Sequence, residues 1–547
     1  MNSRERFFSL LNELKVNNTN TITFYRSNKR YEKTYCEFSF DVDQVLSRLN
    51  YLKHSIGIAK VAIIGPISYD WIVSDIACIK GGFLSIAIPE TLPKEQVINI
   101  VEKTNTDIVL MDFSLADKYN SIHNQVYYIE CNTKEIESNL WKQQKINNNF
   151  VVENLILEEY SIVFSSGTSK EIKFIKKIFR NIEKEEESFL EQIKQIAYYI
   201  RYGKSLWSRK NNKLLIFMPF SHSQQRDFFR MALLKKINIV LSDHKNCIKH
   251  IIIENPNIMV SVPVIYEAMA ERIKIKIGKF NGIQQLFYKF FNILRINTFL
   301  NGNYIKRIFS FFLFKEIRKI YGGRADYFIT GSAPISDEVV RVFYGIGVKL
   351  FQAYGQTETG NIAMNTPFDF KIGSVGKPIK KIRISDESEI LVKYNMNRHS
   401  CNKEILNIDN NEYIHTGDLG YLDKEGFLFI IGRKDDVIVL ENGEKVFPDR
   451  IESFIKSSEI VKDVCVFSKG YKLYAVLNCF GYNDKNKLAV KKWIQCINNE
   501  LSIYEKIYGY HIAEYPFSHE NELLTATFKK KRNDIIKYYW NYEFIII

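Results

Sequence analysis

The chain has 547 residues, of which 46% are hydrophobic and 25% charged, and its formal net charge is +14. At about 150 residues per domain this length predicts several compact units, and the composition is that of a globular protein. No stretch reaches the roughly 18 consecutive apolar residues that a membrane-crossing helix needs. Residues 1–18 lack the apolar centre of a signal peptide, and the eight cysteines include no CxxC pair, which argues against a zinc site. We therefore expect reduced thiols and a cytoplasmic location.

The first part of the chain alternates between short apolar runs and helical patterns. Residues 61–65 form an apolar run that ends in glycine, and 68–80 have helical spacing around Trp71. Two glycines then lead into the apolar run 83–88, and 108–111 form another. This rhythm predicts a parallel sheet covered by helices, for which we expect a purely structural role.

A loop rich in hydroxyl groups follows the strand-like run 160–164. Its hydroxyl residues surround one glycine and precede a series of lysines: Ser165, Ser166, Gly167, Thr168 and Ser169, then Lys170, Lys173, Lys176 and Lys177. Hydroxyl and backbone donors combined with positive charge can bind a polyphosphate. Such turns are also common without a ligand, so the residues alone leave both interpretations open.

The next strand-like run, 214–219, leads into a short polar segment that contains His222 and Arg226. A single histidine after a strand is more often a structural hydrogen-bonding group than a catalytic one. A functional role for His222 therefore needs support from elsewhere in the chain.

Residues 271–324 concentrate the positive charge of the chain, with twelve Lys and Arg against two Glu. The segment is also rich in Phe, Tyr, Ile and Leu, so amphipathic helices with basic outer faces are the simplest interpretation. A surface that rests on anionic lipid and admits an apolar substrate is the alternative. No nucleic-acid-binding motif accompanies this charge, so we expect no nucleic-acid partner.

Two more strand-like runs lead into polar turns. The run 327–330 precedes Gly331, Ser332 and Ala333, and the run 348–351 precedes a stretch that contains Tyr354, Gly355, Thr357 and Glu358. At the carboxyl end of a strand, such residues can stack on a base, contact a phosphate and hold Mg²⁺ through hard oxygen ligands. A polar turn without a ligand is the simpler alternative.

Residues 413–452 read as the junction between a large body and a smaller C-terminal piece. An apolar run, 427–431, stops at the charged segment 432–436, and a second run, 437–440, follows. Asn442-Gly443 favours a two-residue hairpin, and Pro448 begins a helical pattern. Upstream, Asp418 follows a glycine, which allows a ligand to approach the backbone closely. A solvated linker is the alternative interpretation of the charged segment.

The remainder of the chain predicts strands at 464–467 and 473–478 and an amphipathic helix at 487–501. Near the end, Lys529 begins a run of four basic residues. Such runs are usually solvated.

Six segments, in order, resemble motifs of the adenylate-forming superfamily, which includes acyl-CoA synthetases, luciferases and nonribosomal adenylation domains. They are the loop at 165–174 (similar to TSGTTGxPKG), YGQTE at 354–358, GSVGKP at 373–378, TGD at 416–418, GRKDD at 432–436 and LTATFKKKR at 524–532. The segment PFSHSQQR, at 219–226, resembles PLxHxxER of the long-chain fatty acyl-CoA synthetases. Lys170, Ile172 and Phe174 depart from the phosphate-loop motif, and Ala526 replaces a proline of the last motif.

The resemblance implies a role for each residue that matches a motif position. Those implied as catalytic are Lys529, Thr357 and His222. Those implied to bind ATP or AMP are Ser165, Ser166, Gly167, Thr168, Lys173, Ser332, Ala333, Tyr354, Gly355, Asp418 and Arg433. Glu358 and Thr168 would hold the metal, Lys434 and Asp435 would form a hinge, and Asn442 and Gly443 would border a thiol channel.

The resemblance also implies a fold and an activity. The fold would be α/β, with a layered αβαβα N-terminal domain at 1–433, a β-rich subdomain at about 365–433, and a small mobile α+β C-terminal domain at 434–547. The activity would be ATP- and Mg²⁺-dependent conversion of a carboxylic acid, in particular a long-chain fatty acid, to acyl-AMP, followed by transfer to the thiol of CoA. One alternative is a fatty acyl-AMP ligase or adenylation protein that loads the phosphopantetheine of an acyl carrier protein. Another is a non-catalytic relative that binds nucleotide or acyl chains.

Overall fold

The structure is a computed structural model. It describes residues 3–119, 122, 125–129, 159–164, 174–178, 212–280, 282, 285–286, 317, 319–323, 327–346, 348, 350–366, 369–394, 407–441, 443–458, 460–479, 484–518, 521–525 and 530–547. The predicted phosphate loop at 165–173, Asn442, Lys529 and most of the basic segment lie outside these residues.

Within the described residues, the first sheet has six strands in the order β6-β5-β3-β4-β7-β8. Its strands are β3 (Lys60–Ile64), β4 (Leu84–Ile88), β5 (Ile108–Asp112), β6 (Gln125–Ile129), β7 (Glu159–Phe164) and β8 (Phe174–Ile178). All neighbours are parallel except β7 and β8. The accompanying helices are α2 (Tyr35–Ile56), α3 (Tyr69–Gly81) and α4 (Lys94–Lys103), with a 3₁₀ turn at Phe113–Leu115. The parallel sheet expected from the alternating pattern is therefore present.

The second sheet has nine strands among the described residues, in the order β15-β14-β13-β12-β11-β9-β10-β1-β2. Its strands are β1 (Thr21–Arg26), β2 (Lys29–Thr34), β9 (Lys213–Ile216), β10 (Asn238–Leu241), β11 (Ile258–Ser261), β12 (Tyr327–Thr330), β13 (Leu350–Gln356), β14 (Gly360–Met364) and β15 (Lys377–Pro378). Its helices are α1 (Ser3–Leu14), α7 (Ser223–Leu234), α8 (Cys247–Glu254), α9 (Pro263–Gly278) and α13 (Asp337–Gly345), with a 3₁₀ turn at Lys319–Tyr321. The six strands β13, β12, β11, β9, β10 and β1 are parallel to one another, so their carboxyl ends lie at one edge.

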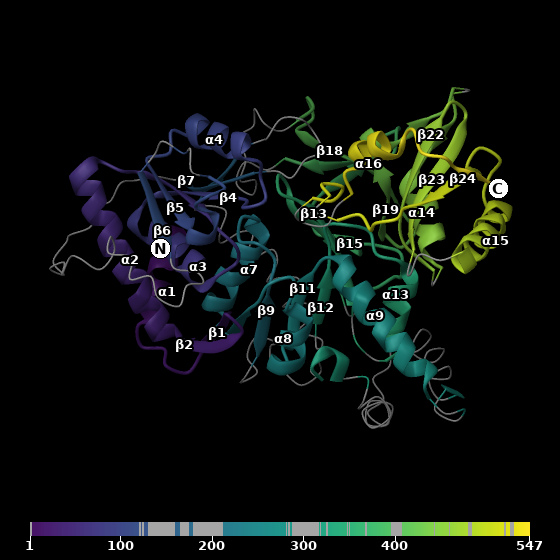
Figure 1. The fold of residues 1–547 in the computed structure, drawn as a ribbon. Helices are drawn as coiled ribbons and strands as arrows, with labels where there is room; N and C mark the ends of the chain where they lie inside the picture. Colours follow the sequence, from purple (N-terminus) through teal and green to yellow (C-terminus); the bar gives the residue numbers. More distant parts are fainter. Residues whose placement is uncertain are drawn as a thin grey trace.

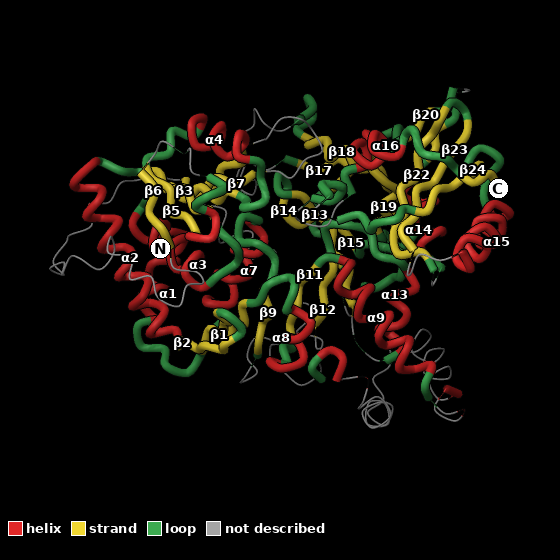
Figure 2. Tube along the Cα trace, in the orientation of Figure 1, coloured by secondary structure: helices red, strands yellow, loops and turns green. Residues whose placement is uncertain are grey.

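Helices α3 and α7 lie between the two sheets (Figure 2). Their apolar side chains join strands of both sheets in one core, which includes Trp71 and Phe229. Arg226 of α7 is buried there and lies 3.1 Å from Asp75 of α3 and 2.8 Å from the Ser161 hydroxyl of β7. Ser85 donates a further hydrogen bond of 2.6 Å to the Asp75 oxygen that faces Arg226. Arg226 thus fixes the orientation of α7 relative to the first sheet.

A small antiparallel sheet follows, in the order β16-β17-β18-β19. Its strands are β16 (Ile382–Ile384), β17 (Glu389–Lys393), β18 (Tyr413–Leu422) and β19 (Leu428–Arg433). Strand β18 has an irregularity between Leu419 and Gly420. This sheet agrees with the β-rich region expected after residue 365.

The described residues from 434 onward are called the C-terminal unit below, and those before them the body. The unit lies at one end of the molecule (Figure 1). Its elements are a 3₁₀ turn at Lys434–Asp436, β20 (Ile438–Val439), β21 (Lys445–Val446), α14 (Pro448–Lys456), β22 (Val461–Lys469), β23 (Lys472–Cys479), α15 (Asp484–Glu500), β24 (Ile507–Ile512), α16 (Arg532–Tyr539) and β25 (Ile545–Ile546). Helices α14 and α15 share a core with strands β22 to β24. No described helix meets the length and apolarity that crossing a membrane requires.

The predicted two-residue hairpin at 442–443 is wrong in its register. Leu440 N donates to Glu444 O at 2.9 Å, which leaves a three-residue loop, and Gly443 N donates to Leu440 O at 2.8 Å. Gly443 has φ of +85°, the left-handed conformation that commonly closes a three-residue hairpin loop. The glycine was therefore correctly associated with a turn, but it occupies the last position of the loop.

Candidate active site

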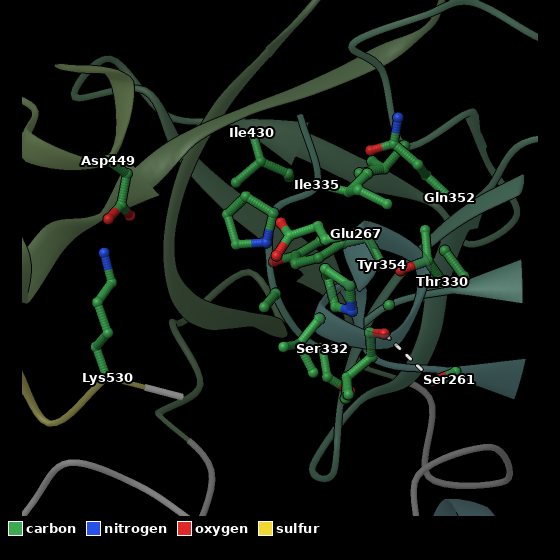
Figure 3. Close-up of a pocket in the computed structure, with 18 of the residues that line it drawn as sticks. Ser261, Glu267, Thr330, Ser332, Ile335, Gln352, Tyr354, Ile430, Asp449 and Lys530 are labelled. Atoms are coloured by element: carbon green, nitrogen blue, oxygen red, sulfur yellow. Dashed lines mark hydrogen bonds between the residues drawn. The ribbon is translucent and has the colours of Figure 1, made fainter. Parts of the chain in front are cut away.

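A large cavity lies between the body and the C-terminal unit. Its walls include the carboxyl ends of β11, β12 and β13, parts of β18 and β19, and one side of α14. Ligands of open parallel sheets bind where the carboxyl ends of the strands meet, so the position agrees with the sequence-based expectation. Figure 3 shows Ser332 and Tyr354 on one side of this cavity, and Lys530 and Asp449 on the other.

Asp418 is the centre of a hydrogen-bond network on the body side. Its Oδ2 accepts bonds of 2.7 Å from the Tyr354 hydroxyl and 2.7 Å from the Gln356 side-chain amide. Its Oδ1 lies 3.4 Å from Nε of Arg433, which is the β18–β19 register partner of Asp418. Burial, followed by the charge of Asp418, raises the pKa of Tyr354, so this hydroxyl remains a donor. A carboxylate has about four acceptor positions, so Asp418 keeps acceptor capacity toward the cavity.

Tyr354 and Gly355 lie within β13, not beyond its end, because the strand continues to Gln356 and pairs with β14. A side chain at position 355 would bring its Cβ within 2.4 Å of the carbonyl oxygen of Gly360, so glycine is required for this pairing. Thr357 and Glu358 follow in the turn that leads to β14, and both line the cavity. A threonine hydroxyl and a carboxylate are hard oxygen ligands that suit Mg²⁺.

Ser332 and Ala333 line the cavity in the turn after β12. Ser332 has φ of +69°, which is uncommon for a residue other than glycine. Strained backbone conformations concentrate at ligand-binding sites. The conformation of Ser332 thus agrees with a turn shaped for a ligand.

His222 lines the cavity at the N-cap position of α7. Its backbone N–H donates to Pro219 O at 3.1 Å, and its own carbonyl accepts from Gln225 N at 3.1 Å. This turn fixes where the ring enters the cavity wall, close along the chain to Met218, which also lines it.

The predicted phosphate loop, including Ser165, Ser166, Gly167, Thr168 and Lys173, lies outside the described residues, but its two ends are described. Phe164 and Phe174 are register partners in β7 and β8, and their rings pack edge to face at 5.5 Å. Phe164, directly before the loop, and Lys177 of β8 line the cavity. The replacement of the last motif glycine by Phe174 has a structural reason, since that residue closes the base of the loop as part of a strand.

Lys529 is likewise not described, but the residues that flank its segment are. Leu524 and Lys530 form an antiparallel bridge, and both line the cavity. The residues on either side of the segment that includes Lys529 therefore belong to the cavity wall.

The predicted hinge residues form a 3₁₀ turn between β19 and β20. Lys434 Nζ lies 2.8 Å from Glu387 and 3.4 Å from Glu389, both in the body, and Asp435 lines the cavity. Gly443, by contrast, is absent from the cavity lining among the described residues.

Several cavity residues were not identified from the sequence. Gln356 occupies the variable position of the YGxTE motif. The motif therefore did not predict its hydrogen bond to Asp418. Glu90 lies two residues after the predicted strand 83–88, and its position there was a usable signal. Three further cavity residues come from helix α14 and the end of the chain, which only the tertiary structure brings together: Asp449, Glu452 and Lys530.

Comparison with known proteins identifies the family of this chain. The family model for AMP-binding enzymes matches residues 13–394, and the model for an AMP-binding enzyme C-terminal domain matches 435–530. The chain therefore belongs to the AMP-binding enzyme family, and the resemblance seen in its motifs is confirmed. Long-chain-fatty-acid–CoA ligases are among its relatives in this family.

Among its relatives, the long-chain-fatty-acid–CoA ligase FadD15 of Mycobacterium bovis is 22% identical over 86% of this chain and 85% of its own length. Long-chain-fatty-acid–CoA ligase 5 of Mus musculus is 24% identical over 86% of this chain and 77% of its own length. Among solved structures, an o-succinylbenzoate CoA synthetase from Bacillus subtilis, in complex with its acyl-adenylate intermediate, has a TM-score of 0.69 at 18% identity, covering 96% and 97% of the two chains. This likeness confirms the expected α/β fold with a large N-terminal and a smaller C-terminal part.

Proposed function

We propose that this protein is an AMP-forming acyl-CoA synthetase that uses ATP to activate a long-chain fatty acid and transfers the acyl group to the thiol of CoA. The observation that carries this proposal is the cavity in which the Asp418 network and the Lys530 end of the C-terminal unit face each other. The membership of the AMP-binding family supports it, as does the activity of relatives named long-chain-fatty-acid–CoA ligases.

In the first half-reaction, a carboxylate oxygen of the substrate attacks the α-phosphorus of ATP, and pyrophosphate leaves. This step needs charge neutralisation and alignment more than proton transfer. We assign Asp418 to the ribose hydroxyls, Arg433 to ribose or phosphate, and Tyr354, Ser332 and Ala333 to the adenine side. Thr168, Thr357 and Lys529 would contact the phosphate and carboxylate oxygens, while Glu358 and Thr168 would hold Mg²⁺. The metal would supply additional positive charge at the phosphates.

In the second half-reaction, the thiol attacks the acyl carbonyl and AMP leaves. We propose that residues 434–547 turn as a unit about Lys434 and Asp435 between the two steps. Gly443 does not reach the cavity wall in the described orientation, whereas Lys530 does. This orientation therefore suits adenylation, and the turn would bring the loop of Asn442 and Gly443 to the thiol channel.

The decisive experiment is carboxylate-dependent exchange of pyrophosphate into ATP, measured with a panel of fatty and aryl acids. We expect exchange with long-chain fatty acids and consumption of free CoA. Exchange without CoA consumption would favour a ligase that loads an acyl carrier protein. Failure of every acid to support exchange would overturn the proposal in favour of a non-catalytic binding protein.

Lys529→Ala tests the role of the chain end. We expect this change to abolish acyl-AMP formation and to spare thioester formation from supplied acyl-AMP, because the lysine stabilises charge only in the first step. Equal loss of both half-reactions would contradict the assignment.

We also propose a peripheral membrane contact through residues 271–324, based on their concentration of basic and aromatic residues. Sedimentation with anionic and neutral liposomes tests this proposal. Binding should require anionic lipid and should weaken when part of the segment is deleted. If the deletion changes neither liposome binding nor the preference for fatty-acid chain length, the segment has a structural role.

A further inference from the structure

A compact ionic cluster joins helix α14 to the end of the chain. Glu452, on α14, is only 3% exposed. Its carboxylate forms ion pairs with Lys530 and with Arg532. The distance from Glu452 Oε1 to Arg532 Nη1 is 2.5 Å. Arg532 also lies 2.9 Å from Asp449. Glu452 thereby connects one helix to two cations of the terminal segment.

Backbone groups complete the cluster. Lys530 donates to the carbonyl oxygen of Val464 at 2.7 Å, and Arg532 donates to that of Val466 at 2.9 Å. Glu452 accepts from the Val466 amide at 2.8 Å. Helix α14, strand β22 and the terminal segment are thus held at one point.

The neighbouring cations keep the Glu452 carboxyl ionised. Burial alone would raise the pKa of Glu452, but Arg532 and Lys530 outweigh this effect and lower the pKa to about 2. Glu452 is therefore ionised throughout the physiological range. Replacing such a triad by apolar residues often costs little stability, so stability alone gives a weak reason for its presence.

The position of the cluster gives a stronger reason. Glu452, Lys530 and Arg532 all line the cavity. Figure 3 shows Lys530 across the cavity from Tyr354 and Ser332. Lys530 also closes the base of the segment 525–529 through its bridge with Leu524. The Lys531 amide donates to the Leu523 carbonyl at 3.0 Å, which secures the same base.

We propose that Glu452 is a positioning residue for adenylation, because it holds the base of the segment that carries Lys529 at the cavity wall. This inference rests on the proposed function. A misplacement of about 1 Å can reduce the rate of an enzymatic step about 100-fold. The second half-reaction, which proceeds with this segment turned away, should depend much less on Glu452.

The test compares Glu452→Gln, which keeps the shape of the side chain and removes its charge, with Glu505→Gln as a matched control. Glu505 also pairs with α14, at 3.0 Å from Arg450. Its other hydrogen bonds among the described residues are with Ser502, and it does not line the cavity. For each variant, acyl-AMP formation and thioester formation from supplied acyl-AMP are measured per folded molecule. We expect Glu452→Gln to slow adenylation about 100-fold and thioester formation less than 5-fold, and Glu505→Gln to leave the ratio unchanged.

A second measurement does not depend on activity. Cleavage by a lysine-specific protease after residues 529–531 should become faster in Glu452→Gln than in the wild type or in Glu505→Gln, because the base of the segment is released. Faster cleavage with a selective loss of adenylation supports the inference. Unchanged cleavage, or an equal loss of both half-reactions, overturns it. An inactive wild type would refute the proposed function, and protease cleavage would still decide whether Glu452 holds the segment.

Discussion

Lys456 of helix α14 lies 3.3 Å from Glu267 of helix α9, and this ion pair joins the C-terminal unit to the body. The two side chains are 25% and 24% exposed, so solvent screens the pair only in part. The contact holds α14 against the cavity in the orientation that places Lys530 at its wall. It should therefore favour the first half-reaction over the second.

Glu267→Gln should slow acyl-AMP formation by up to about 5-fold, because ion pairs of this exposure contribute roughly 0.2–1 kcal/mol. Thioester formation from supplied acyl-AMP should not fall. Single-turnover measurements of each half-reaction at low and high salt provide the check. The charge-swapped double variant, Glu267→Lys with Lys456→Glu, should recover the wild-type ratio, and its failure to do so would contradict the role of the pair.

Asp418→Asn should raise the KM for ATP about 10- to 100-fold, since hydrogen bonds to a charged group contribute about 1.5–3 kcal/mol. The KM for the carboxylic acid should change much less, because Asp418 is assigned to ribose. Tyr354→Phe removes one donor to Asp418 and should give a smaller effect in the same direction. Steady-state kinetics with each substrate varied separately test this prediction, and an equal rise in both KM values would count against it.

Glu358→Gln should increase the Mg²⁺ concentration required for half-maximal pyrophosphate formation, because a neutral amide is a poorer ligand for this cation than a carboxylate. A Mg²⁺ titration at saturating ATP and acid measures the shift. Raising Mg²⁺ should restore part of the rate. If the rate falls with no change in the Mg²⁺ requirement, Glu358 has a different role.

Glu90 makes stability depend on pH. Burial, followed by the charge of Asp112, raises the pKa of Glu90 from 4.5 to about 7. Between these values the folded state binds more protons than the unfolded state, so the free energy of unfolding falls as the pH rises. Glu90→Gln should therefore match the wild type near pH 4.5 and exceed its stability at pH 8, by on the order of 3 kcal/mol.

Thermal unfolding of both proteins at several pH values tests this prediction. The difference between their midpoints should grow across the window from about pH 4.5 to about pH 7 and should then level off. A constant difference would show that Glu90 does not titrate in this window. The opposite sign would show that its charged form is stabilised in the folded protein.

Local patterns were sufficient for most elements. The helix expected at 68–80 is observed as α3, where the Ser68 hydroxyl accepts from the Trp71 amide at 3.1 Å, because an N-cap is decided by adjacent residues. The sequence did not determine the length of the loop that contains Asn442 and Gly443. Both two- and three-residue loops accept such a pair, and the pairing of Leu440 with Glu444 selects the longer one.

The amino-acid sequence by itself determined the family, the order of the motifs and the approximate extent of the secondary structure, because motif spacing and apolar periodicity are properties of neighbouring residues. Only the tertiary structure decided which distant residues meet: Asp418 with Tyr354 and Gln356, Glu452 with Lys530 and Arg532, and Lys456 with Glu267. These contacts depend on how strands and helices far apart in the chain pack against each other. No local pattern encodes the distance between charges that approach only when the two parts of the molecule come together.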